Sequence, residues 1–359
     1  MKLIAYIRSK PLSILLVALP LALLANFLNW NPVWVFIFSA VGVIPMAEYI
    51  GEATESLTAH TSPKIGGLLN ATLGNAAELI ITIVAIREGL LDLVKASITG
   101  SILGNLLLVM GAAFVFGGVK NGVQKFNSKN ASRYSILLIL AVIALLIPSI
   151  FSAYINPEPT STPVESFSLG IAGVMIVIYV LSLIFNLWTD PIPNQNSAEM
   201  ATKETAWPLT TAIVILAMAT VGVVILSELL VGAVEPVVAS LGVSEFFIGI
   251  ILIPVIGNVA EHVVAVEMAV RNNMDLSVEI AVASSLQIAL FVAPVLVFIS
   301  LLLGNPLQLI FNEFELLALI AGVIITGLVS FDGESNWLEG AQLLAIYLIL
   351  AMAFFLLPS

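Results

Sequence analysis

Long apolar runs alternate with short polar segments along the whole chain. Eleven runs are close to the roughly 20 residues that an α-helix needs to cross a bilayer. They cover residues 11–29, 32–50, 65–87, 96–118, 134–154, 167–188, 208–230, 245–270, 277–303, 314–331 and 338–357. Most connections are short and contain turn-forming residues, as in Trp30-Asn31-Pro32. The pattern predicts an all-α polytopic membrane protein with 11 transmembrane helices.

An internal repeat divides these spans. The segments Gly74-Asn75-Ala76-Ala77-Glu78 and Gly257-Asn258-Val259-Ala260-Glu261 share one pattern at an offset of 183 residues. The same offset pairs other identical residues: Glu52 with Glu235, Gly66 with Gly249, Leu69 with Leu252, Ser101 with Ser284, Leu103 with Leu286, Leu107 with Leu290 and Val109 with Val292. We expect an N-terminal helix in 1–31, a five-helix repeat in 32–188, a cytoplasmic linker in 189–206 and a second five-helix repeat in 207–359. Because each set holds an odd number of spans, the two repeats are inverted relative to each other.

The basic residues predict the orientation of the chain. With the N-terminus inside, the inner side receives ten of the twelve: Lys2, Arg8, Lys10, Lys64, Lys120, Lys125, Lys129, Arg133, Lys203 and Arg271. Only Arg87 and Lys95 fall outside. Since cytoplasmic loops are enriched in lysine and arginine, the N-terminus is expected in the cytoplasm and the C-terminus on the opposite side.

Composition narrows the class further. Sixty per cent of the residues are apolar and ten per cent are charged, which is outside the range of soluble domains. A net charge of −11 argues against nucleic-acid binding. The chain has no cysteine and only two histidines, His60 and His262, which excludes disulfides, thiolate metal sites and a multi-histidine centre. The basic N-terminus before the first apolar run is typical of a signal peptide too, but no clear cleavage site follows, which favours an uncleaved helix.

The two repeated glutamates are the first candidates for chemistry. A carboxylate at membrane depth is costly and usually marks an ion or substrate path. Glu78 and Glu261 occupy matching positions in two halves, which predicts a transporter with one central site. Each has an asparagine three residues earlier, so Asn75 and Asn258 are expected on the same helix faces as the glutamates. The glycine that opens each motif permits close helix approach, or a local break that frees backbone carbonyls as ligands.

The following spans supply further polar side chains. These are Ser101 and Asn105 in the first repeat, and Ser284 and Gln287 in the second. The combined set is dominated by oxygen, which suits a hard cation such as Ca²⁺. Without the ion, two carboxylates in a poorly solvated cavity repel each other and favour proton uptake, whereas the field of Ca²⁺ favours their ionised forms. One site therefore holds either Ca²⁺ or protons, and that competition is the basis of antiport. The pair would titrate as one coupled unit.

Several other polar residues have two readings. Asn105 and Gln287 have Ile288 and Gly104 as repeat partners, so each either lines the pathway or only links helices. His262 either relays protons or hydrogen-bonds a neighbouring helix. The acidic residues near the ends of spans 2 and 7 either form an access path for ions or belong to a solvated rim; they are Glu48, Glu52, Glu55, Glu228 and Glu235.

Four segments carry a resemblance to a known family. GNAAELI (74–80), SILGNLLLVMG (101–111), GNVAEHV (257–263) and SSLQIALFVAP (284–294) resemble the signature repeats of the calcium/proton exchanger family, within the Ca²⁺/cation antiporter superfamily. The resemblance implies that Glu78 and Glu261 bind Ca²⁺ and exchange it for H⁺. It also implies that Asn75, Asn258, Ser101, Ser284 and Gln287 line the pathway, that His262 stands where the family commonly has histidine, and that spans 2 and 7 move to alternate access.

The resemblance also sets expectations for surroundings and partners. Ca²⁺ and H⁺ are substrates, no cofactor is expected, the lipid bilayer is the environment, and a homo-oligomer is left open. The linker lacks the strongly acidic run of many family members, since it holds only Asp190, Glu199 and Glu204 against Lys203. The short N-terminal tail favours a prokaryotic cytoplasmic membrane, with an organellar (vacuolar) membrane as the alternative.

Three rival functions are weighed against Ca²⁺/H⁺ exchange. A Na⁺/Ca²⁺ exchanger of the same superfamily should have more hydroxyl and acidic ligands around its motifs, whereas Asn70, Thr72, Thr82 and Glu267 are the nearest polar exceptions here. An intramembrane hydrolase would need a water-activating carboxylate dyad and gives no reason for the repeat. A passive channel is compatible with the short side chains, but protonatable ligands suit coupled exchange better. The prediction is a transporter and not an enzyme.

Overall fold

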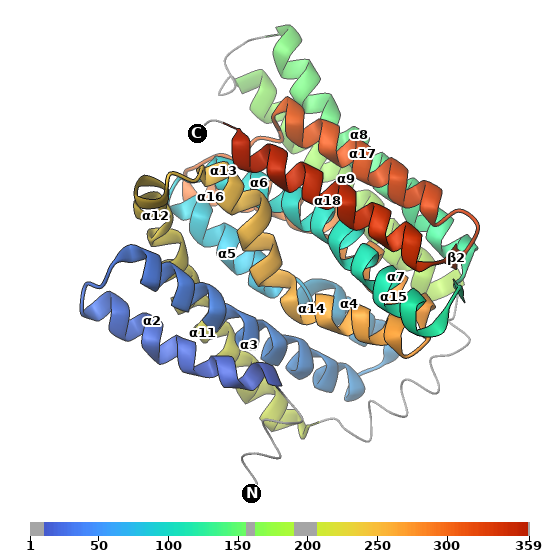
Figure 1. The fold of residues 1–359 in the computed structure, drawn as a ribbon. Coiled ribbons are helices and arrows are strands. Elements are labelled where there is room, and N and C mark those ends of the chain that lie inside the picture. Colours follow the sequence, from blue (N-terminus) through green and yellow to red (C-terminus); the bar gives the residue numbers. More distant parts are fainter. Residues whose placement is uncertain (1–10, 156–161, 190–206, 358–359) are drawn as a thin grey trace, which may run out of the picture. The chain divides into compact units, whose positions relative to one another are not determined.

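The structure is a computed structural model that describes residues 11–155, 162–189 and 207–357 (Figure 1). Its first part contains η1 Pro11–Val17, α2 Ala18–Phe27, α3 Pro32–Ala59, α4 Pro63–Leu73, α5 Ala76–Arg87, α6 Leu91–Leu103, η2 Gly104–Val109, α7 Met110–Asn121, β1 Gln124–Lys125, α8 Ser128–Ile155 and α9 Thr162–Thr189. Its second part contains α11 Leu209–Gly232, α12 Val234–Leu241, α13 Glu245–Phe247, η3 Ile248–Leu252, α14 Ile253–Val270, α15 Met274–Gln287, η4 Ile288–Val292, α16 Ala293–Leu303, α17 Glu313–Val329, β2 Glu334–Ser335 and α18 Trp337–Leu356. All of the predicted linker after Thr189 lies outside these ranges.

The predicted all-α membrane class is confirmed. Within the described ranges, eight continuous helices are long and apolar enough to cross a membrane. The other three predicted spans correspond to shorter helices: η1 with α2, the pair α4 and α5, and the 17-residue α17. The count of eleven crossings remains a prediction.

One predicted span is wrong as a continuous helix. Residues 65–87 form two helices, because α4 ends at Leu73 and α5 begins at Ala76. The interruption falls on Gly74 and Asn75, within the first repeated motif. In the second repeat, α14 runs through Gly257 and Asn258 without a break. Of the two roles expected for the motif glycines, a helix break therefore occurs in the first repeat and not in the second.

The helices also contain π-helical turns that the apolar pattern does not reveal. η2 and η4 are both of this type, and they interrupt the long helices that follow the two motifs. Residues 288–292 of η4 correspond to residues 105–109 of η2 at the repeat offset of 183. The internal repeat therefore extends to a local backbone feature. Such turns are rare, and they occur frequently at functional sites.

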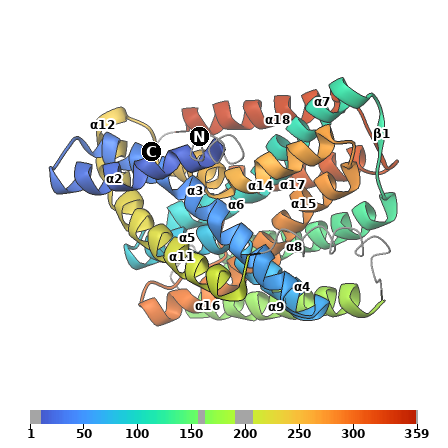
Figure 2. The same ribbon diagram turned by 90° about the horizontal axis from the view of Figure 1, so that it is seen from below.

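The chain forms two compact units. Unit 1 comprises residues 1–84, 180–242 and 256–260, and unit 2 comprises residues 85–179, 243–255 and 261–359. Each unit draws on both halves of the sequence. In unit 1, α3 packs along α11 and α2 packs against α3 (Figures 1 and 2). Gly222 lies where a Cβ would be 2.7 Å from Sδ of Met46, and Gly42 faces Leu226. Small residues at this crossing let the two backbones approach closely, as is typical of membrane helices.

Glycines also permit close helix contacts in unit 2. A Cβ on Gly340 of α18 would lie 2.5 Å from the backbone nitrogen of Val115 and 2.6 Å from the carbonyl of Gly111, both in α7. A Cβ on Gly100 of α6 would overlap the carbonyl of Ile250 in η3. Side chains at these positions would force the backbones apart. The pairs α7–α18 and α6–η3 are thus held at backbone contact.

Hydrogen bonds between loops agree with the prediction that successive connections lie on alternate sides of the membrane. In unit 2, β1 pairs antiparallel with β2, which joins the connection after span 4 to the connection after span 10. Asn305, after span 9, donates to the carbonyl of Ile86 at the end of span 3. In unit 1, His60, after span 2, bonds the carbonyl of Trp207 before span 7. Each bond joins two segments that the alternation assigns to the same side.

Candidate functional site

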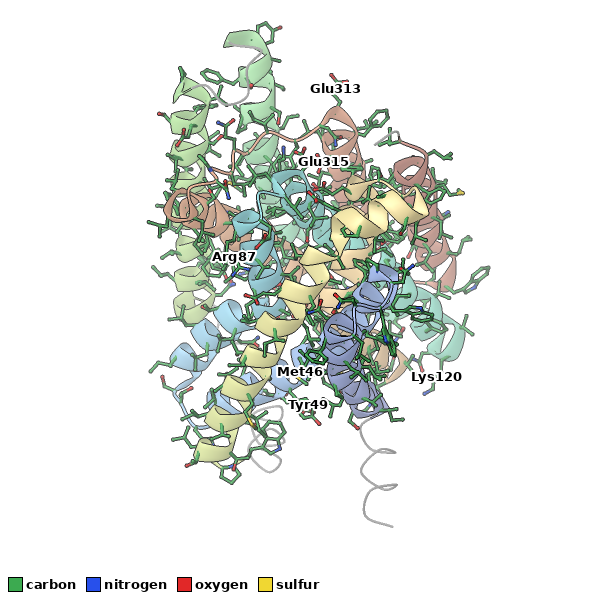
Figure 3. The ribbon with its side chains drawn as sticks, turned by 90° about the vertical axis from the view of Figure 1, so that its left-hand side faces the viewer. Met46, Tyr49, Arg87, Lys120, Glu313 and Glu315 are labelled. Carbon is green, nitrogen blue, oxygen red and sulfur yellow. The ribbon has the colours of Figure 1, made fainter. Side chains whose placement is uncertain are left out.

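In unit 1, Glu78 is buried at the start of α5, with only 5 % of its surface exposed. The preceding residues hold this end of the helix in place, because Ala77 packs in an apolar cluster with Ile50 of α3 and Val223 of α11. Met46 and Tyr49 of α3, labelled in Figure 3, pack against the same cluster. Two helices thus position the turn that carries the carboxylate.

The carboxylate of Glu78 lies against Gly257 of α14. A methyl group at position 257 would be 3.0 Å from Oε1 of Glu78 and 3.3 Å from its Cγ and Cδ. Gly257 therefore leaves the space that the glutamate side chain occupies. This contact joins a residue of the first motif to the motif glycine of the second.

The helix break gives Glu78 a particular electrostatic position. It is the third residue of α5, and the amide of Leu79 donates to the carbonyl of Asn75 directly before the helix. The N–H groups of a first turn point toward the helix N-terminus, where a negative charge is stabilised. Asn75 is almost fully buried beside it. The expected proximity of this asparagine and glutamate is therefore present, although Asn75 precedes the helix rather than sharing its face.

In unit 2, Glu261 belongs to a hydrogen-bonded group of four predicted residues. Ser284 of α15 bonds the Glu261 carboxylate. Asn105 of η2 donates from Nδ2 to Oγ of Ser284 at 2.9 Å, and its Oδ1 accepts from Nε2 of His262 at 3.2 Å. Oε2 of Glu261 is buried and has no hydrogen-bond partner among the residues that the structure describes. One carboxylate oxygen is thus held by a side chain, and the other is left for a further ligand.

The remaining predicted residues lie in both units. Asn258 of α14 and Ser101 of α6 are buried, and Gln287 is half-buried at the end of α15. In unit 1, Glu48 and Glu52 are half-buried on α3, whereas Glu55 is exposed on the same helix. Glu228 on α11 and Glu235 on α12 are also exposed. Both readings of these acidic residues, access path and solvated rim, are compatible with their positions.

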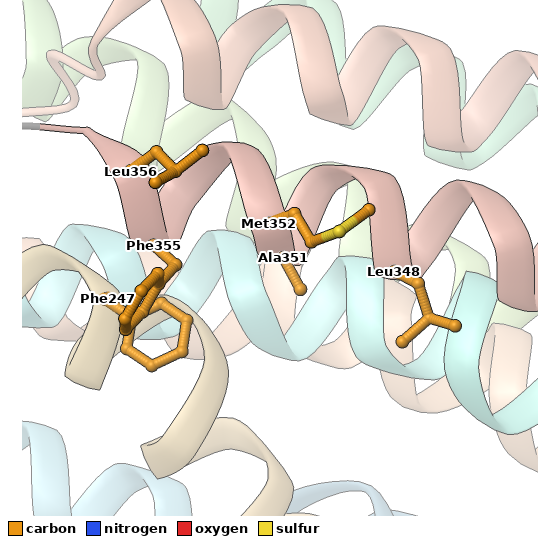
Figure 4. Close-up of a pocket in the computed structure, with 6 residues that line it drawn as sticks. All are labelled: Phe247, Leu348, Ala351, Met352, Phe355 and Leu356. Atoms are coloured by element: carbon orange, nitrogen blue, oxygen red, sulfur yellow. The ribbon is translucent and has the colours of Figure 1, made fainter.

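Neither the cavity shown in Figure 4 nor a cluster of acidic and histidine side chains suggests another cation site. That cavity has a volume of about 400 Å³ and is lined by Phe247, Leu348, Ala351, Met352, Phe355 and Leu356. Its lining offers no oxygen ligand from a side chain. In the part of the chain with described coordinates, no three His, Asp or Glu residues are grouped closely enough to hold a metal ion.

Sequence reasoning missed one buried carboxylate. Glu315 is 3 % exposed in the first turn of α17 (Figure 3). Its Oε2 accepts from the amide of Asn312 at 2.9 Å, which closes a capping box, and its Oε1 accepts from the hydroxyl of Thr99 in α6 at 3.3 Å. The signal was present in the sequence, because asparagine followed three residues later by glutamate is a helix-start pattern. Its bonds give Glu315 a structural role.

Apolar helices of membrane length, with buried carboxylates in a repeated motif, define an α-helical membrane transporter. The sequence matches the family described as "Sodium/calcium exchanger protein" over residues 31–188 and 211–356. The chain belongs to this family. The matched ranges fall on either side of the predicted linker, and the resemblance seen in the motifs is confirmed.

Close relatives extend over nearly the whole chain. The "Ca(2+)/H(+) antiporter" of Aphanothece halophytica is 44 % identical over 358 residues, covering 96 % of each chain. The "Ca(2+)/H(+) antiporter ChaA" of Bacillus subtilis is 45 % identical over 342 residues, covering 94 % of this chain and 96 % of its own. The solved structure of native YfkE is 43 % identical, with a TM-score of 0.85, and covers 96 % of this chain and 100 % of its own. The two antiporters are similar to this chain in sequence, and the solved structure is similar to it in both sequence and fold.

Proposed function

We propose that this protein exchanges Ca²⁺ for H⁺ across a membrane by alternating access. The proposal is supported by full-length similarity to relatives that are named Ca²⁺/H⁺ antiporters. Ca²⁺ and H⁺ are its substrates. The same similarity favours a proton over Na⁺ as the counter-ion, although the family as a whole is described by sodium/calcium exchange.

The proposed cation site is built on Glu78 and Glu261. It is supported by the recurrence of both glutamates at the offset of 183 residues and, within unit 1, by the contact of the Glu78 carboxylate with the glycine of the second motif. Ca²⁺ would be bound by the two carboxylates, with Oε2 of Glu261 as one ligand atom. Protons would neutralise the same oxygens when the ion leaves, because two unbalanced charges at membrane depth are costly.

The buried polar residues near the motifs complete the proposal. Asn75, Asn258, Ser101, Ser284, Gln287 and Asn105 would line the cation pathway, because amide and hydroxyl oxygens are suitable ligands for Ca²⁺. His262 is bonded to Asn105, which supports a role in the polar surroundings of Glu261. Glu48 and Glu52 on α3, Glu228 on α11 and Glu235 on α12 would form an access path that attracts cations.

The inverted repeats and the orientation remain part of the proposal. One N-terminal helix and two five-helix repeats would place the N-terminus in the cytoplasm and the C-terminus on the other side. The hydrogen bonds between loops support the alternation of spans, and the basic residues support the choice of side.

Ca²⁺ flux in proteoliposomes tests this function. An imposed pH gradient should drive Ca²⁺ against its own gradient in the wild type, and Glu78→Gln or Glu261→Gln should abolish that flux. Glu267→Gln is the matched control, because Glu267 lies on the same helix as Glu261 but is exposed and paired with Arg271. Flux that follows a Na⁺ gradient and ignores pH would overturn the proton assignment. Full activity in both glutamine variants would overturn the site.

A further inference from the structure

The hydrogen bonds around Glu261 form a chain with one direction. The Nε2–H of His262 donates to Oδ1 of Asn105, and the Nδ2–H of Asn105 donates to Oγ of Ser284. The Ser284 hydroxyl bonds the carboxylate of Glu261. Every donor therefore points toward the glutamate. Hydrogen bonds that run in series polarise one another and strengthen the last member.

Asn105 decides the direction of this chain. A serine hydroxyl rotates freely and has one hydrogen to donate. When the Asn105 amide donates to Oγ of Ser284, the hydroxyl hydrogen is left to point at the carboxylate. The amide of Asn105 thereby sets Ser284 as a donor to Glu261, and its oxygen holds the His262 ring in place. Asn105 is 1 % exposed, so no bulk water competes for these bonds.

The sequence provides no equivalent of this arrangement for Glu78. At the offset of 183, Ser284 corresponds to Ser101, but Asn105 corresponds to Ile288 and His262 corresponds to Leu79. The π-helical turn that carries Asn105 does recur as η4. The backbone feature is therefore common to both repeats, whereas the amide is specific to one. This difference argues against a purely backbone role for residue 105.

We propose that Asn105 is a positioning residue for Glu261, acting through the hydroxyl of Ser284. It holds the carboxylate in the orientation that receives the cation. This inference rests on the proposed Ca²⁺/H⁺ exchange, and it replaces the simpler reading of Asn105 as a residue that only links helices.

A double-mutant cycle on the full-length protein in proteoliposomes tests the proposal. Ser284→Ala should raise the KM for Ca²⁺ about tenfold, as expected for one lost hydrogen bond to a charged group. Asn105→Leu should raise it about fivefold with Vmax within about twofold, because the site is misaligned but the moving helices are intact. The double variant should match Ser284→Ala alone, because Asn105 acts through that serine.

Two further variants separate positioning from packing. Asn105→Asp keeps the size of the side chain and the acceptor for His262 but cannot donate to Ser284, so its KM should also rise. Ile288→Leu alters the equivalent π-helical turn of the second repeat and should leave KM unchanged. Elution as a single species in detergent checks that each variant is folded.

Three outcomes would overturn the inference. One is a KM within twofold of wild type in both Asn105 variants. Another is a double variant in which the fold-increase in KM equals the product of the fold-increases of the two single variants. The third is a wild type without Ca²⁺/H⁺ exchange, which would remove the proposed function as well; the other two leave that function intact.

Discussion

The two repeated motifs have nearly the same sequence but different local structures. Gly74 and Asn75 interrupt the helix before Glu78, so this glutamate is the third residue of α5. Gly257 and Asn258 lie within α14, and Glu261 is the ninth residue of that helix. A helix N-terminus stabilises the charge of the first glutamate, and a donor chain of side chains holds the second. The two motifs are therefore similar in sequence, but different groups stabilise their two carboxylates.

The two motif glycines also differ in what they do. In the first repeat, the glycine lies at a helix end with helical backbone angles. In the second repeat, Gly257 provides the space that the Glu78 side chain fills. The second motif thus supplies its own carboxylate and also part of the surroundings of the other. This dependence suggests experiments that affect the two glutamates separately.

The largest effect is expected from Gly257→Val. The added side chain would begin 3.0 Å from Oε1 of Glu78, so the carboxylate must move. A displacement of about 1 Å in a preorganised site costs on the order of 100-fold in rate, and Ca²⁺ flux should fall by about that factor. Gly170→Val in α9 is the control, because a Cβ there meets nothing within 4 Å. Wild-type flux in Gly257→Val would show that the contact with Glu78 is unimportant.

A smaller effect is expected at His262, which hydrogen-bonds Asn105 and whose equivalent in the first repeat is Leu79. His262→Leu removes the donor to Asn105 and should raise the KM for Ca²⁺ about threefold, as expected for a neutral hydrogen bond. His262→Gln retains an N–H donor and should stay near wild type. Measured exchange rates across both variants decide between two roles: if the imidazole relays protons, the glutamine variant will be as slow as the leucine variant.

The smallest effect is expected at Thr82, beside the first glutamate. Its hydroxyl donates to the backbone carbonyl of Glu78 at 2.7 Å, within the same helix. Thr82→Val keeps the shape and leaves the carboxylate untouched, so KM should change less than about twofold, because such back-bonds add little to a helix. A change as large as that of Ser284→Ala would mean that the two glutamates are supported alike.

The membrane spans could be predicted from the sequence because their signal is length and apolarity alone. The predicted spans are found as helical segments, from η1 to α18, although the third is divided into α4 and α5. The break at Gly74 and Asn75 could not be predicted from hydropathy, because hydropathy does not change where a helix is interrupted inside an apolar run. The π-helical turns could not be predicted from hydropathy for the same reason. They depend on one extra residue per turn and not on residue type.

The site was predicted in part. The repeat offset identified the two glutamates, their asparagines and the paired serines, which are the residues that recur in both halves. Asn105 received no support from symmetry, because its partner is Ile288. Its role depends on a contact between residues 179 positions apart, which no local pattern contains. Glu315 lies outside the repeated motifs, so the repeat offset does not point to it, although its capping pattern is visible in the sequence.

The central claim is that Ca²⁺ and protons compete for Glu78 and Glu261, and Ca²⁺ binding to the purified protein at several pH values tests it most directly. Protons must leave before the ion binds, so Kd for Ca²⁺ should rise as pH falls, by up to about tenfold per pH unit for each displaced proton. Ca²⁺ addition should release protons from the wild type, and Glu78→Gln or Glu261→Gln should bind Ca²⁺ weakly and release fewer. A Kd that does not change with pH, with no proton release, would contradict the account.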